Sequence, residues 1–139
     1  MSTRATYQFI RFDDDESVSV TVYKHHDGYP EGAVRWLTNT VVDLVCHGEL
    51  VSNSLRYSIH PKEVAHAFMR ANSKHGFMEI TPSYKDHADT EYHYVITPHF
   101  SVLVFGKNDG EKYPNTLLFE GTLAKANEKN FGHLILKNN

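Results

Sequence analysis

The chain has 139 residues, enough for one domain with a single core, and its hydrophobic share of 40% and charged share of 22% are ordinary for a globular protein. Its net charge of −3 supplies no basic footprint for nucleic acid, and the longest apolar run, residues 41–45, is far shorter than the roughly 20 residues of a membrane helix. Cys46 is the single cysteine and the N-terminal residues lack the layout of a secretory signal, so we expect one cytoplasmic domain over residues 1–139.

Two strands are predicted near the N-terminus. The aromatic and apolar run of residues 6–12 is followed by an acidic cluster at residues 13–16, which is typical of a solvated turn. Residues 17–24 then carry valine at every second position, the pattern of a half-buried strand. The two runs therefore predict a β-hairpin.

A turn and a long helix are predicted next. Asp27, Gly28 and Pro30 break the strand, because Asp-Gly favours a turn with positive φ and proline suits the first turn of a helix. Apolar residues then recur at helical spacing as far as Gly48, a candidate C-cap. The predicted inner face consists of Ala33, Val34, Leu37, Val41, Leu44 and Val45. Near the end of this helix, Cys46 is interpreted as a small buried hydrophobe.

The remaining sequence predicts a second helix and several more strands. Residues 49–59 are polar and irregular, and a helix is expected from Pro61 to about Lys74. Further predicted elements are strands over 77–81, 91–97, 100–106 and 116–123, an exposed loop over 82–90 and a short helical turn over 124–130. These elements favour an α+β fold, with a largely antiparallel sheet of five or six strands and two helices on one face.

The sequence YKHHDGYPEG, residues 23–32, concentrates the candidate binding groups at one turn. The turn immediately precedes a helix N-terminus, whose unpaired amides and dipole attract anions such as phosphate, although Glu31 already complements that dipole. The predicted ligand-binding residues are Lys24, His25, His26, Asp27, Tyr29 and Arg35. The alternative is that the turn residues are purely structural and the histidines face solvent.

A metal site is poorly supported by the spacing of the ligands. His25, His26 and Asp27 carry suitable atoms, but neighbours in extended backbone point to different sides, and no HExxH or paired CxxC element completes a set. His87 and His93 form a second loose cluster across a loop. We therefore predict no metal and no cofactor.

Catalysis is also incompletely supported. If the protein is an enzyme, His25 or His26 would act with Asp27 in acid/base chemistry on a nucleotide. The aromatic residues that would either stack a nucleotide base near the turn or pack in the core are Tyr23, Tyr29, Trp36, Tyr92 and Tyr94. No Walker A, GxSxG or GxGxxG element is present.

The turn and the opening Arg4-Ala5-Thr6-Tyr7-x-Phe9 resemble an uncharacterised family of small phage and prophage proteins. Members share a RATY-like strand and a Y-K-H-x-D-G-Y-P-x-G turn, and the resemblance covers about the first third of the chain. No activity is attached to that family. The resemblance implies an accessory protein of the host cytoplasm, in a setting where such proteins bind host defence components or sequester their nucleotide signals.

Three functional hypotheses follow. The leading one is a non-enzymatic binding protein that captures a host protein or a phosphate-bearing small ligand such as a nucleotide signal. The rival is a histidine-dependent nucleotide hydrolase or transferase. The third is an oligomeric or structural role, because the exposed edge of an open sheet favours a homodimer. No membrane or nucleic-acid partner is predicted.

Overall fold

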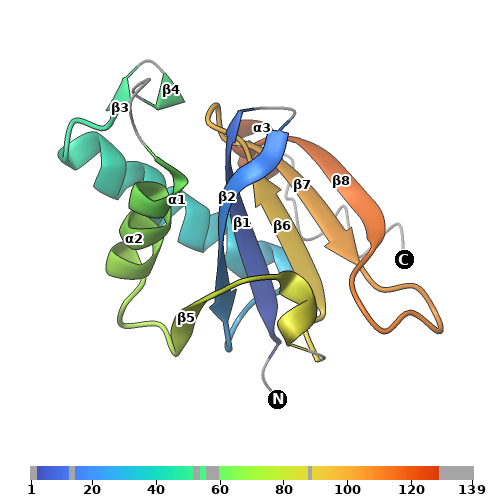
Figure 1. The fold of residues 1–139 in the computed structure, drawn as a ribbon. Helices are drawn as coiled ribbons and strands as arrows, with labels where there is room; N and C mark the ends of the chain where they lie inside the picture. The colour runs from blue at the N-terminus through green and yellow to red at the C-terminus, as the bar shows by residue number, and fades with distance from the viewer. Residues whose placement is uncertain (1–2, 13–14, 52–53, 56–59, 88, 129–139) are drawn as a thin grey trace.

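The computed structural model describes residues 3–12, 15–51, 54–55, 60–87 and 89–128 (Figure 1). Six strands form one sheet in the order β5-β2-β1-β6-β7-β8. The strands are β1 Ala5–Phe12, β2 Asp15–Lys24, β5 Met78–Thr81, β6 Tyr92–Ile96, β7 Ser101–Gly106 and β8 Thr116–Thr122. All neighbours are antiparallel except β1 and β6, which run parallel. The α+β fold and the largely antiparallel sheet are therefore confirmed.

Two longer helices connect β2 to β5 and pack on one face of the sheet (Figure 1). These are α1 Pro30–Cys46 and α2 Pro61–Ala71, and a short helix, α3 Leu123–Glu128, follows β8. The helical turn predicted for residues 124–130 thus forms, although its last two residues lie outside the described part of the chain. No helix in the described ranges combines the length and apolarity needed to cross a bilayer.

The ends of α2 are determined by local hydrogen bonds. His60 caps its start by accepting a hydrogen bond from the Lys62 amide at Nδ1, at 3.0 Å, and Pro61 occupies the first helical position. The helix ends before the predicted Lys74, because the Asn72 side chain donates to the carbonyl of Phe68 at 2.9 Å.

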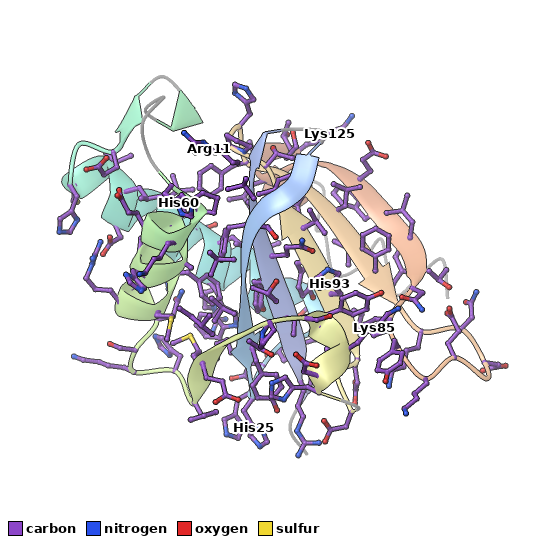
Figure 2. All side chains as sticks on the ribbon, viewed as in Figure 1. Arg11, His25, His60, Lys85, His93 and Lys125 are labelled. Atoms are coloured by element: carbon purple, nitrogen blue, oxygen red, sulfur yellow. The ribbon has the colours of Figure 1, made fainter. Side chains whose placement is uncertain are left out.

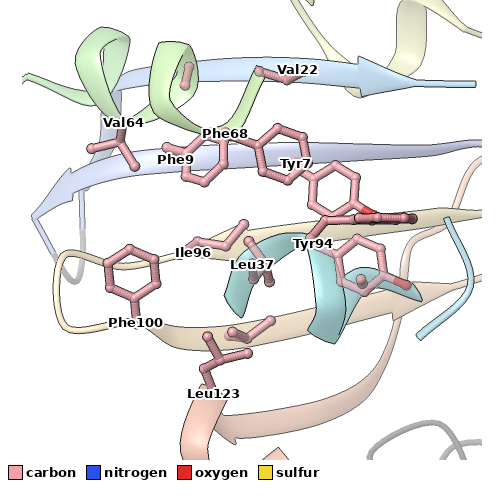
Figure 3. Packing of buried hydrophobic residues seen from close by; sticks show 14 of the residues in the cluster. Tyr7, Phe9, Val22, Leu37, Val64, Phe68, Tyr94, Ile96, Phe100 and Leu123 are labelled. Atoms are coloured by element: carbon pink, nitrogen blue, oxygen red, sulfur yellow. The ribbon is translucent and has the colours of Figure 1, made fainter. Parts of the chain in front are cut away.

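The core lies between the helices and the face of the sheet that they cover, here called the helix face. Alternation along the strands directs one set of side chains to it: Tyr7, Phe9, Val22, Tyr94, Ile96, Val102 and Val104. Phe68 of α2 packs on this layer, with its ring centroid 4.6 Å from that of Tyr7 and 5.5 Å from that of Phe9 (Figure 3). Leu37 of α1 is fully buried in the same cluster.

The inner face predicted for α1 is partly wrong at its C-terminal end. Val45 is 55% exposed and Cys46 is exposed, whereas Leu44 is buried. Each helical residue advances by roughly 100°, so once Leu44 points inward the next two residues point to the side and outward. Cys46 is therefore a surface thiol.

Two segments that were predicted to lack regular secondary structure contain short elements of it. A small two-stranded sheet, β3 Leu50–Val51 with β4 Ser54–Leu55, forms within the region predicted as irregular. The rest of that prediction lies largely outside the described residues. The described residues of this region contribute no strand to the main sheet.

The loop predicted as exposed, residues 82–90, is largely exposed in its described part, but it also lies against the open face, the side of the sheet opposite the helices. It contains a 3-10 turn, Tyr84–Asp86, and two of its rings stack on strand residues. Tyr84 stacks on His93 with centroids 4.3 Å apart, and His87 stacks on Tyr23 at 3.8 Å. Because the loop is polar in composition, its sequence does not predict these aromatic contacts, which hold the loop in place.

Candidate functional site

The turn after β2 is held by its own backbone carbonyls, which bind buried side chains. The carbonyls of residues 26–28 each accept a hydrogen bond from a different side chain. Lys24 Nζ donates to the first at 2.9 Å, Trp36 Nε1 to the second at 2.9 Å, and Tyr94 Oη to the third at 2.6 Å. Because one donor each comes from β2, α1 and β6, the turn is fixed against three elements of the fold.

Lys24, predicted to bind a ligand, is instead fully buried on the helix face. Its ammonium donates to the carbonyl of His75 as well as to the turn, and it lies 4.5 Å from the centre of the Trp36 ring. Burial lowers the pKa of Lys24, and the charge of Asp27 partly offsets this by raising it. The Lys24 ammonium therefore serves the protein's own backbone and is not presented to a ligand.

The small residues of the turn motif are required by close packing. A Cβ at Gly28 would lie 2.4 Å from the Cβ of Ala5, and a Cβ at Gly32 would lie 2.3 Å from the carbonyl oxygen of Asp27. The positive φ predicted for the Asp-Gly pair belongs to Asp27, at 56°. Asp27, Gly28 and Gly32 are thus explained by the architecture of the turn.

His25 belongs to a hydrogen-bonded cluster at the end of the open face, where Figure 2 shows it near the N-terminal end of the chain. Its Nδ1 lies 2.8 Å from Tyr23 Oη and accepts a hydrogen bond from Arg4 Nε at 3.3 Å. An arginine can only donate, so Nδ1 is the acceptor and the neutral ring carries its proton on Nε2. Partial burial, Arg4 and His26 lower the pKa of His25.

The loop over the open face adds further residues to this hydrogen-bonded cluster, here called the Tyr23 cluster. The His87 ring stacks on Tyr23, and its Nε2 lies 3.5 Å from Glu79 Oε1. Asp89 forms an ion pair with Arg4. Sequence reasoning did not assign Arg4 to a site and grouped His87 with His93, because only the fold shows which strands the loop crosses.

The other predicted binding residues are arranged around the turn on its exposed side. The His26 ring meets the His25 ring edge to face at 4.6 Å and packs on Gly76, where a Cβ would approach it to 2.8 Å. Tyr29 is 39% exposed just before α1. Arg35 is exposed, with its guanidinium carbon 5.6 Å from the centre of the Trp36 ring.

His93 is buried on the open face, and sequence reasoning did not predict this structural position. The hydroxyl of Thr6 lies 2.8 Å from His93 Nδ1, and His93 Nε2 lies 3.1 Å from Gln8 Oε1. Burial lowers the pKa of His93 to about 4, so the ring is neutral at pH 7. His93, Tyr84 and Phe105 contribute to a small pocket of about 160 Å³.

A larger pocket, of about 380 Å³, lies at the end of β6, β7 and β8. It is lined by Glu91, Tyr92, Gly106, Lys107 and Leu118. None of the six predicted binding residues lines either pocket. Of the aromatic residues considered for base stacking, Trp36 and Tyr94 are buried, whereas Tyr92 is only half-buried and lines the larger pocket.

Neither the arrangement of metal-binding side chains nor the comparison with known proteins assigns a function to the site. Within the described ranges, no group of three or more histidine, cysteine or acidic side chains is arranged to hold a metal ion. Comparisons of the chain with family models, curated proteins and solved structures gave no match.

Proposed function

We propose that the protein is a non-catalytic binding protein of phage or prophage type, which captures a phosphate-bearing small ligand such as a nucleotide signal of host defence. The observation that supports this proposal is a continuous run of cationic or protonatable side chains around the turn, here called the turn surface. Its members are Arg4, His25, His26, His75 and Arg35.

Contacts connect the turn surface from one end to the other. Arg35 lies over Trp36, whose ring centre is 4.7 Å from that of His75. His26 packs on the residue after His75 and against His25, which is bonded to Arg4. In a chain of net charge −3, this concentration of basic groups is local; guanidinium groups are strong donors to phosphate, and the neutral His25 ring keeps an N–H donor at Nε2.

Titration calorimetry with cyclic dinucleotides, ADP-ribose derivatives and nucleoside phosphates tests the proposal. We expect saturable binding of at least one class, weakened about tenfold or more by Arg35→Gln, because a charge-assisted hydrogen bond contributes roughly 1.5–3 kcal/mol. Lys62→Gln removes an exposed charge from α2 and should leave affinity unchanged. Absence of binding by every phosphate compound would refute the proposal.

The rival enzyme hypothesis predicts turnover through a histidine and Asp27. The Nδ1 of His25 is bonded to Tyr23 and Arg4, so this nitrogen is not oriented by the Asp27 carboxylate. A nucleotide panel with divalent metal, analysed for products, distinguishes the hypotheses. Product that disappears in His26→Ala or Asp27→Ala would establish the rival and contradict a non-catalytic function.

Capture of a host protein is a second candidate, favoured by the apolar edge beside the turn. Phe77 is 55% exposed and Ile80 of the edge strand β5 is 47% exposed. The carbonyl of Phe77 accepts a hydrogen bond from the amide of His25 at 3.0 Å, so this edge adjoins the turn surface. Cross-linking in a host lysate should yield a partner that is lost when both apolar residues are changed to serine.

A further inference from the structure

The smaller pocket, of about 160 Å³, lies on the open face of the sheet. Three adjacent strands supply its floor: Gln8 from β1, His93 and Val95 from β6, and Phe105 from β7. The register places these side chains on one face, because Gln8 pairs with Val95 and His93 pairs with Phe105. The residues that precede them in each strand belong to the core on the other face.

Two loops form the walls of this pocket. Tyr84 comes from the 3-10 turn, and Pro114 and Asn115 come from the loop before β8. Tyr84 stacks on His93, which Figure 2 shows beside the 3-10 turn, and its hydroxyl donates to Asn115 Oδ1 at 2.5 Å. The two loops are therefore tied to each other and, through Tyr84, to the floor.

The volume of the pocket matches a single small ring. In other proteins an apolar cavity of about 150 Å³ accommodates benzene. A pocket of about 160 Å³ therefore has space for one six-membered ring, whereas the fused ring pair of a purine exceeds it. The apolar part of the lining, which consists of Val95, Phe105 and Pro114, supplies contact surface for the faces of such a ring.

The lining of the pocket is polar in part but uncharged. Among the described residues that line it, none is acidic and none is lysine or arginine. His93 is neutral at pH 7, because burial lowers its pKa to about 4. A phosphate or carboxylate would lose hydration on entering and gain no opposite charge, so the lining favours a neutral ligand.

Two side-chain amides of the lining have hydrogen-bonding capacity to spare. Gln8 Oε1 accepts from His93 Nε2 at 3.1 Å, and Gln8 Nε2 donates to Ser19 Oγ at 3.1 Å. An amide accepts two hydrogen bonds and donates two, so Gln8 retains one of each. Asn115 Oδ1 accepts from Tyr84, and its Nδ2 donates to no group in the part of the chain that the structure describes. Side-chain amides of this kind pair with the donor and acceptor edge of a nucleobase.

We propose that this pocket binds a pyrimidine nucleoside, with the base inside and the sugar at the mouth. A pyrimidine base is a neutral six-membered ring whose edge carries adjacent donor and acceptor atoms. It therefore satisfies the volume, the lack of charge and the spare amide groups together. Gln8 and Asn115 hydrogen-bond to the base, and Phe105 contacts its ring. This site goes beyond the proposed function, because it requires no phosphate and uses none of the turn-surface residues.

Calorimetry with uridine, 3-methyluridine and adenosine tests the proposal. The methyl group of 3-methyluridine replaces the N–H donor on the base edge, and adenosine carries a fused ring pair. We expect uridine to bind 1:1, and 3-methyluridine to bind about tenfold or more weakly, the effect of hydrogen-bonding groups left without partners. Adenosine should bind more weakly than uridine by at least a similar factor, because its second ring does not fit.

A pair of asparagine variants from one loop locates the site. Asn115→Ala should weaken uridine about fivefold or more through loss of its amide, and because Asn115 is exposed the fold should be preserved, as circular dichroism verifies. Asn108→Ala, at an exposed residue outside the pocket lining, should bind uridine as the unmodified protein does.

Proton NMR gives a second readout that does not depend on any variant. Uridine should shift the ring resonances of His93, which lines the pocket, and leave those of the exposed His66 on α2 unchanged. Absence of uridine binding, equal affinity for adenosine, the same affinity in Asn115→Ala as in the unmodified protein, or unmoved His93 resonances at saturation would each overturn the proposal. Phosphate capture at the turn surface would survive any of these results, because it depends on Arg35.

Discussion

Replacing Tyr94 with phenylalanine removes a single oxygen atom from the bond that ties the turn to β6. Tyr94 is fully buried, and its hydroxyl donates to the carbonyl of Gly28 at 2.6 Å. The change leaves the ring and its packing in place, so the main consequence is a buried carbonyl that has lost this partner. Such a loss costs about 1–3 kcal/mol.

The expected loss is measurable by thermal or urea unfolding. For a domain of this size, 1 kcal/mol corresponds to a shift in Tm of roughly 3–5 °C. We therefore expect Tyr94→Phe to lower Tm by roughly 3–15 °C while leaving the dependence of the unfolding free energy on urea unchanged.

Tyr7 supplies a matched control within the same core. It is fully buried and stacks on Tyr94 with centroids 4.9 Å apart, yet its hydroxyl has no hydrogen-bond partner in the structure described. Tyr7→Phe therefore removes an unsatisfied polar atom and should be neutral or stabilising. Equal destabilisation by the two substitutions would refute the reasoning that the turn is fixed by its carbonyl bonds.

Three further predictions concern pH, packing and the thiol. The pKa of His93 falls to about 4 in the folded protein, against about 6.5 in the unfolded chain, so its contribution to stability is complete above pH 6.5 and is lost as pH falls towards 4. Between pH 7 and pH 5 this loss is about 2 kcal/mol in urea unfolding; it should vanish in His93→Gln and persist in the exposed-site control His66→Gln. Gly28→Ala should lower the unfolding free energy by roughly 1–3 kcal/mol through overpacking, and a wild-type-like urea midpoint would contradict the close approach to Ala5. Cys46 should react with a thiol reagent in the native protein as fast as in urea; protection in the native state would contradict its exposure.

Much of the fold was predictable because local patterns agree with the tertiary structure. Alternating residues identified β2 and β6, and Pro30 marked the start of α1. The same alternation predicts the side-chain orientation of Lys24, because Lys24 continues the series of alternate valines in β2 that face the helices. The parallel pairing of β1 with β6 was not predictable, because no short-range pattern determines contacts between strands about 85 residues apart.

The candidate site was only partly predictable for the same reason. The turn motif identified His25 and His26, but Arg4 and His87 join them through strand pairing and a loop that crosses the sheet. The close contact of Gly106 with Leu118 likewise joins two strands, so no pattern within one strand predicts it.

Calorimetric titration of the phosphate compounds, followed by recovery of the ligand, tests the central claim most directly. A non-catalytic binding protein predicts saturable binding that weakens in Arg35→Gln, with the ligand recovered chemically unchanged. Conversion of the ligand to product, or the same affinity in Arg35→Gln as in the unmodified protein, would contradict capture at the turn surface.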